Sequence, residues 1–297
     1  MRLLLLTCWW LLLVIVPVYA EQVTDALGRQ VGGDLVPQRV VSLAPAVTEI
    51  LFALGLDDEI VGVTSFCNYP ERARSKPKIG EYASPNLEIL AAMQPELVVM
   101  AADASSPELL SRLEGLGIAV YIAYPRSVAE TVTLIRSLGQ LLGKAEAAAV
   151  LATGLEQTAA CAQRQVALRP KVRVLCTVMS QPLVVAGRQT LIDDLIRIAG
   201  GDNVVPEGLS RYPTWGIESV LSADPDLILV SPHPGQTDPS AFYRNWPELK
   251  AVRTGRLASV EADWIQRPGP RLSLGLRALT RALHGIDVDP ESSQCQD

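Results

Sequence analysis

A short segment of this 297-residue chain occurs twice, and this duplication limits the folds that the chain can adopt. Residues 86–99 (NLEILAAMQPELVV) align without gaps with residues 216–229 (GIESVLSADPDLIL). Each copy predicts a short helix that has an acid near its start and stops at a proline, followed by an apolar strand. A strand without polar alternation is typical of a sheet covered on both faces, which favours a parallel α/β fold.

The similarity extends to both sides of the duplicated segment. A candidate strand and a helix that ends at glycine precede each copy, and a further strand follows it. These elements are 39–43, 48–54 and 118–122 in the first half, and 173–177, 191–199 and 257–260 in the second. The shared order of elements predicts two duplicated α/β lobes rather than one large sheet.

The stretch between the two halves predicts a long helix. Residues 144–168 are rich in Ala, Glu, Gln and Leu and contain no proline, and Pro170 stops a helix before the second half begins. The expected domains are an N-terminal lobe over 21–143, a connecting helix over 144–169 and a C-terminal lobe over 170–297. A rigid connecting helix should limit the hinge between the lobes.

The first 20 residues have the pattern of a signal peptide. Arg2 precedes an apolar run that reaches Val18, and Ala20 provides a small residue at the cleavage point. A membrane anchor is the alternative, but the run is short for a bilayer span and no basic cluster follows it. We therefore expect export and cleavage after Ala20. The globular composition, 48% hydrophobic with a net charge of −6, disfavours nucleic acid and anionic membranes as partners.

Signatures of catalysis and of metal binding are missing from the sequence. There is no GxGxxG after the first strand, no P-loop and no G-x-S-x-G. The two histidines, His233 and His284, have no obvious co-ligand nearby, and His284 is expected on the surface of the last helix. We expect no enzyme, no metal site and no cofactor. The four cysteines outside the signal peptide predict one disulfide or none, without indicating which pair; they are Cys67, Cys161, Cys176 and Cys295.

Aromatic residues gather in loops that follow candidate strands, where an open α/β sheet forms its ligand crevice. They are Phe66, Tyr69 and Tyr82 in the first half, and Tyr212, Trp215, Trp246 and Trp264 in the second. Flat rings at such places favour a flat or macrocyclic ligand held by stacking and apolar burial. The alternative is ordinary packing within each lobe.

Glu88 and Glu218 occupy matching positions in the two copies of the duplicated segment. A carboxylate near a helix start is favoured by the helix dipole, by about 0.3–1 kcal/mol, and this alone can explain both acids. The functional interpretation is that the duplication places one acid on each lobe. Two such acids would dock on a two-fold partner that carries arginines.

From about residue 35 to residue 285, the chain resembles the periplasmic substrate-binding components of ABC importers for cobalamin and iron-siderophores. The residues that carry this resemblance are RVVSLAPAVTE at 39–49, VGVT at 61–64, PNLE at 85–88 and PELV at 95–98. The resemblance implies two Rossmann-like lobes joined by one long α-helix, in a periplasmic protein. Because these motifs are shared across the family, they indicate the fold and not the cargo.

Narrower features resemble the cobalamin branch. They are CNYP at 67–70, YPTW at 212–215, and ADW at 262–264 with Arg267 and Pro270-Arg271. The resemblance implies that Tyr69, Trp215, Asp263, Trp264 and Arg267 contact the ligand, and that Glu88 and Glu218 dock on permease arginines. Tyr82 stands where a cobalamin binder has Trp, and is expected to contact the ligand as well. Ala199 and Ala282 replace the two cysteines of a disulfide in that binder, so that bridge is absent here.

These expectations describe a monomeric, non-catalytic binding protein. It would capture a corrinoid between its lobes and deliver it to the permease dimer of an ABC transporter. A siderophore or haem binder of the same family is the first alternative. An exported corrinoid-processing enzyme is a weaker one, because the sequence offers no combination of nucleophile, base and acid.

Overall fold

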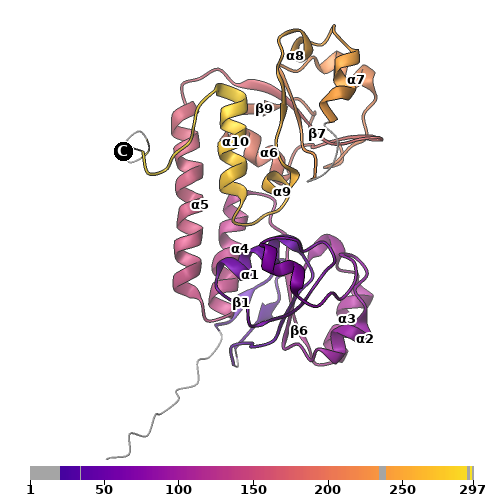
Figure 1. The fold of residues 1–297 in the computed structure, drawn as a ribbon, viewed down its shortest axis with the longest axis vertical. Helices are drawn as coiled ribbons and strands as arrows, with labels where there is room; N and C mark the ends of the chain where they lie inside the picture. The colour runs from indigo at the N-terminus through magenta and orange to yellow at the C-terminus, as the bar shows by residue number, and fades with distance from the viewer. Residues whose placement is uncertain (1–20, 34, 234–238, 293–294, 296–297) are drawn as a thin grey trace, which may run out of the picture.

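Two α/β lobes lie at opposite ends of the molecule and are joined along one side by a long helix, α5 (Ala145–Val166) (Figure 1). The computed structural model describes residues 21–33, 35–233, 239–292 and 295. The expected architecture of two Rossmann-like lobes on a single connecting helix is confirmed. The expected signal peptide, residues 1–20, lies outside the described residues. No helix in the described part of the chain is both long and apolar enough to cross a membrane.

The first lobe is built on a four-stranded parallel sheet with the strand order β4-β3-β5-β6. Its strands are β3 (Val40–Ser42), β4 (Ile60–Val63), β5 (Leu97–Ala101) and β6 (Ala119–Ala123). A separate antiparallel pair, β1 (Val23–Thr24) and β2 (Gln30–Val31), opens the described chain. Alternate residues of the buried strands pack on opposite faces: Val98 joins one apolar cluster, whereas Leu97 and Val99 join another. This two-sided burial explains the unbroken apolar pattern of the strands.

The second lobe repeats this plan with a difference at one edge. Its sheet has the order β11-β10-β7-β8, and β9 pairs with β7. The strands are β7 (Val172–Ser180), β8 (Leu183–Val185), β9 (Gly201–Asn203), β10 (Leu227–Val230) and β11 (Leu257–Ser259). β8 is antiparallel to β7 and the other pairs are parallel. β7 is longer than the strand expected over 173–177 because it continues into this hairpin with β8.

The duplicated segment forms the same local structure in both lobes. Helix α2 (Leu87–Ala92) leads into β5, and helix α7 (Ile217–Ala223) leads into β10. Gln94 and Asp224, at equivalent positions before the prolines, both adopt a left-handed backbone with φ of 46° and 35°. A non-glycine residue rarely adopts this conformation, so its presence at both positions shows that the duplication preserves the turn itself.

The remaining helices cover the sheets and join the lobes. They are α1 (Pro45–Ala53), α3 (Pro107–Gly115), α4 (Val128–Leu141), α6 (Leu191–Ile198), α8 (Lys250–Arg253), α9 (Ala262–Ile265) and α10 (Leu272–His284), with the short 3₁₀ helices η1 (Glu71–Ser75), η2 (Ala102–Ala104) and η3 (Pro239–Asn245). Both α4 and α10 pack along α5. One apolar cluster runs from the first lobe through α4 and α5 into α6 and α10. The lobes therefore share a core along this side.

A buried ion network also joins the two lobes. The Glu49 carboxylate on α1 accepts hydrogen bonds from Arg271 Nε (2.8 Å) and Nη2 (2.6 Å) and from Arg267 Nη1 (3.0 Å). Asp263 on α9 pairs with Arg271 Nη2 at 3.2 Å and with Arg267 Nη2 at 3.0 Å. The side chains of Glu49, Asp263 and Arg271 are each at most 9% exposed. We call these four residues the lobe joint.

The two acids of the lobe joint favour the charged form of Arg271. Burial opposes the charge of Arg271, but the hydrogen bonds and negative charges of Glu49 and Asp263 outweigh it and raise the pKa of the guanidinium above its usual value. Two buried acids face two arginines, and the more exposed Glu261 lies 3.8 Å from Arg271 Nη1. Such a network fixes geometry more than it adds stability, because desolvation offsets most of the attraction.

One disulfide joins Cys161 on α5 to Cys295 near the C-terminus, and this agrees with the expectation of one bridge or none. It ties the end of the chain to the connecting helix. Cys67 and Cys176 are buried free thiols. Burial raises the pKa of the Cys176 thiol to about 12, so this thiol stays protonated and unreactive.

We predict that a chain beginning at Glu21 shows two alkylated cysteines when it is denatured without reductant, and four after reduction, because only Cys161 and Cys295 are paired. Intact-mass measurement after iodoacetamide treatment counts the labels. The control Cys295→Ser should show three labels under both conditions. Four labels without reductant in the parent chain would contradict the pairing.

We predict that Glu49→Gln lowers the free energy of unfolding by about 3–5 kcal/mol, because it leaves Asp263 as the remaining buried acid beside two nearly buried guanidinium groups. Urea unfolding followed by circular dichroism measures the change. The exposed Glu88→Gln provides the matched control and should lower stability by no more than about 1 kcal/mol, the contribution of a carboxylate near a helix start. A loss of under 1 kcal/mol for Glu49→Gln would mean that the network behaves as an ordinary surface pair.

Candidate ligand cleft between the lobes

A cleft of about 330 Å³ lies between the lobes and takes its walls from both. The first lobe contributes the carboxyl ends of β5 and β6 with the loops that follow them, together with Tyr82. The second lobe contributes the start of α6, the loop that holds Arg211 and Tyr212, and the residues Gln266 and Pro268. The location matches the crevice expected beyond the strand ends of α/β sheets.

Tyr82 is expected from the sequence to contact the ligand, and the structure places it in the lining of the cleft. Its ring lines the cleft, and its hydroxyl donates a 2.6 Å hydrogen bond to Asp103 Oδ1. Burial, reinforced by this bond and by the charge of Asp103, raises the pKa of Tyr82 well above its usual value. The ring is therefore a neutral and firmly oriented wall.

Tyr212, rather than Trp215, presents the aromatic ring of the second lobe to the cleft. Tyr212 lines the cleft and is 50% exposed. Withdrawal of its hydroxyl from water raises the pKa of Tyr212 to about 12. Trp215 packs against the apolar cluster of the second lobe, and its backbone N–H donates to Leu183 O at 2.9 Å. Both residues lie in the YPTW segment, and only the fold distinguishes the ring that packs on the core, Trp215, from the ring that lines the cleft, Tyr212.

The other residues expected at the ligand lie beside the cleft or inside the protein. Asp263 and Arg267 belong to the lobe joint, where each is engaged by an opposite charge. Trp264 packs against the shared apolar core. Tyr69 is 47% exposed, with its ring centroid 4.3 Å from Arg271 Cζ, so it lies directly on the lobe joint.

A second hollow, of about 470 Å³, opens beyond the carboxyl ends of β7 and β10 and is lined by Thr177, Ser231 and His233 among others. Gln266 connects the two spaces, because it lines the cleft and donates a 2.8 Å hydrogen bond to Ser231 Oγ. His233 Nδ1 lies 3.6 Å from Asp263 Oδ1. The edge of the second lobe thus offers polar groups continuous with the cleft.

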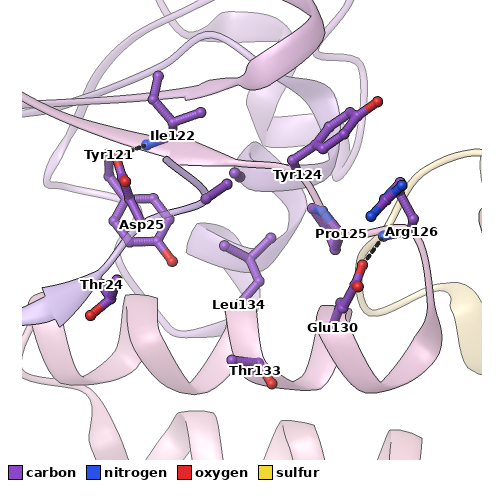
Figure 2. A pocket seen from close by; sticks show the side chains of 12 residues that line it. Thr24, Asp25, Tyr121, Ile122, Tyr124, Pro125, Arg126, Glu130, Thr133 and Leu134 are labelled. Carbon is purple, nitrogen blue, oxygen red and sulfur yellow. Dashed lines mark hydrogen bonds between the residues drawn. The ribbon is translucent and has the colours of Figure 1, made fainter. Parts of the chain in front are cut away.

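A third hollow, of about 330 Å³, lies on the first lobe between β6 and α4 (Figure 2). Asp25 Oδ2 accepts a hydrogen bond from Ile122 N in this hollow, and Glu130 accepts one from Arg126 N. Figure 2 also shows Tyr124 extending from the end of β6 away from α4. Tyr124 and Arg126 line both this hollow and the interlobe cleft, so they form the partition between the two.

Neither a metal centre nor a thiol nucleophile emerges from the described residues. They contain no group of three or more His, Cys, Asp or Glu side chains that could hold a metal ion. The thiol of Cys67 is enclosed by the hydroxyls of Thr48 and Thr64, at 3.1 and 3.2 Å. His284, expected on the surface, is half-buried with Nε2 3.3 Å from Gly200 O, and burial lowers its pKa.

Glu88 and Glu218 lie in the first turns of α2 and α7, and both are exposed. The two helices face the same side of the molecule, away from α5, one on each lobe (Figure 1). The duplication thus places each acid in the first turn of the corresponding helix of its lobe.

Comparisons with known proteins agree with this architecture. The vitamin B12-binding protein of Vibrio vulnificus strain CMCP6 is 28% identical over 257 residues, which cover 84% of this chain and 91% of that protein. The crystal structure of the periplasmic vitamin B12 binding protein BtuF of Vibrio cholerae matches with a TM-score of 0.75 and 25% identity, over 83% of this chain and 96% of that chain. The periplasmic haem-binding protein RhuT from Roseiflexus sp. RS-1, in its apo form, matches with a TM-score of 0.73 and 30% identity, over 82% and 97%.

The family model described as "Periplasmic binding protein" matches residues 40–263, a range that runs from β3 through both sheets to α9. With its two lobes, its single connecting helix and its cleft between the sheets, this chain belongs to the family of periplasmic binding proteins.

Proposed function

We propose that this protein is an exported solute-binding protein that captures a corrinoid between its lobes and delivers it to the permease of an ABC transporter. The observation that carries the proposal is the interlobe cleft, with Tyr82 on one lobe and Tyr212 on the other. Two neutral aromatic rings on opposing walls suit a broad macrocycle held by stacking. The names of the vitamin B12-binding relatives support the corrinoid over other cargo.

A haem binder is the second candidate. It is favoured by the likeness to a haem-binding protein at 30% identity, a higher value than that of the vitamin B12 binding structure. A siderophore is a weaker cargo, because Arg188, an arginine next to the cleft lining, pairs with Asp202 at 3.1 Å and lies 3.7 Å from Asp193. We also propose that the protein is a monomer, that it acts in the periplasm, and that it binds its ligand without catalysing a reaction.

We predict that the chain beginning at Glu21 binds cyanocobalamin one-to-one with a Kd between nanomolar and low micromolar, about 8–12 kcal/mol, because a preformed cleft avoids much of the ordering cost. Isothermal titration calorimetry measures it, with haem and a ferric siderophore as comparison ligands. Tyr212→Ala should weaken binding about tenfold or more, and Trp215→Phe, which keeps a ring in the lobe core, should leave it within about threefold. Binding of haem alone would transfer the proposal to the second candidate.

Release to the permease is the other half of the proposed function. The shared core and the lobe joint hold the lobes together, so we expect little spontaneous opening in solution. Glu88 and Glu218 are exposed in the first turns of α2 and α7, and these two helices lie on the side of the molecule away from α5 (Figure 1). They are placed to pair with arginines of a two-fold permease, which would then bear on both lobes at once.

We predict that Glu88→Ala combined with Glu218→Ala abolishes stimulation of the transporter's ATPase activity in proteoliposomes, while the Kd for cyanocobalamin changes less than about twofold. The loss is expected because both docking charges are gone and neither residue lines the cleft. Glu146→Ala with Glu207→Ala removes two other exposed acids and should stimulate normally. Normal stimulation by the Glu88/Glu218 variant would refute docking through these acids.

A further inference from the structure

Two guanidinium groups from opposite lobes meet at one aromatic ring in the cleft. Tyr124 follows the end of β6, and its ring centroid lies 5.4 Å from Arg126 Cζ and 5.3 Å from Arg211 Cζ. Arg126 belongs to the first lobe and Arg211 to the second, and all three residues line the cleft. Figure 2 shows Tyr124 and Arg126 next to each other, just beyond the end of β6. Contacts with an aromatic face orient a guanidinium without using its hydrogen-bond donors.

Within the described part of the chain, neither guanidinium has a carboxylate partner in an ion pair. Glu130, the acid nearest Arg126 in Figure 2, is bonded to its backbone N–H. Asp103, which also lines the cleft, is held by the Tyr82 hydroxyl. By contrast, Arg188 does have a carboxylate partner: it pairs with Asp202 at 3.1 Å and precedes Gln189 of the cleft lining. Two cationic groups remain at the cleft in a chain whose net charge is −6.

We propose that Arg126 and Arg211 bind an anionic group of the ligand, a phosphodiester or a carboxylate, and thereby make the cleft selective for macrocycles that carry one. The inference rests on the proposed function and deepens it. Both guanidinium groups present free donors, and a planar fork matches the oxygens of either anion. An anion between them would also relieve the repulsion between two like charges. Cyanocobalamin offers a phosphodiester in its nucleotide loop, which cobinamide lacks, and haem offers two carboxylates.

The test compares ligands with and without the anion. Calorimetric titrations use the parent chain, Arg126→Gln, Arg211→Gln and the double variant against cyanocobalamin, dicyanocobinamide, haem and haem dimethyl ester. The matched control is Arg112→Gln, an exposed arginine on α3 that is not part of the cleft lining. Because Arg126 and Arg211 are exposed, the variants should keep the parent's unfolding midpoint.

We expect the double variant to weaken cyanocobalamin binding about tenfold or more while dicyanocobinamide binding stays within about threefold, since a charge-assisted hydrogen bond commonly contributes about one order of magnitude in affinity. If the parent binds haem and not corrinoids, a selective loss for haem over its dimethyl ester supports the anion site and refutes the corrinoid cargo. Equal losses for the charged and uncharged ligand of a pair, or no loss at all, would overturn the inference and leave the binding function standing. Absence of binding to all four ligands would overturn both.

Discussion

The pairing of Glu49 with Arg267 and Arg271 decides how the two lobes face each other. Glu49 lies on the first helix of the first lobe, whereas both arginines follow α9 in the second lobe. The carboxylate is 1% exposed, so its separation from the arginines would leave a buried charge without compensation. Since the apolar core also passes through α4, α5, α6 and α10, the lobes are held at two places. The width of the cleft is therefore set before any ligand arrives.

A preset cleft changes what its lining residues have to do. Tyr82 and Tyr212 offer flat walls, and the Tyr82–Asp103 hydrogen bond keeps one of them in place. Arg126 and Arg211 add charge at the ring of Tyr124, which lies between them. Because the lobes are already ordered, little conformational entropy is lost on binding, and this favours affinity. The same rigidity means that release of the ligand requires a force from outside that acts on both lobes. The exposed acids Glu88 and Glu218, in helices α2 and α7 on the side of the molecule away from α5, are where a permease could apply such a force.

The duplicated segment made most of the fold predictable. It fixed the helix and strand that follow each other in both lobes, and α5 lies within the alanine-rich range that predicted it. The resemblance to the family supplied the arrangement of the two lobes around that helix. These features depend on local patterns of apolar residues and helix breakers, which a sequence displays directly.

The site was less predictable because its chemistry depends on long-range pairing. Asp263 and Arg267 have the residue types of ligand contacts, but Glu49 lies more than 200 positions away from Arg267 in the sequence and engages it in the lobe joint. Trp215 and Tyr212 lie three positions apart in the same loop, and only the packing of Trp215 on the second core leaves Tyr212 at the cleft. No sequence pattern marks Arg126 as a site residue. Its link to Arg211 runs through the ring of Tyr124, a contact between distant parts of the chain that only the fold creates.

If the relative position of the lobes is fixed before binding, a macrocycle enters the cleft without moving them. A crystal structure of the protein grown with cyanocobalamin would show whether this happens. We expect a corrinoid between the lobes in contact with Tyr82 and Tyr212, with the Glu49–Arg271 pair intact. A corrinoid bound elsewhere, or a bound state in which that pair is broken and the lobes have rotated, would contradict it.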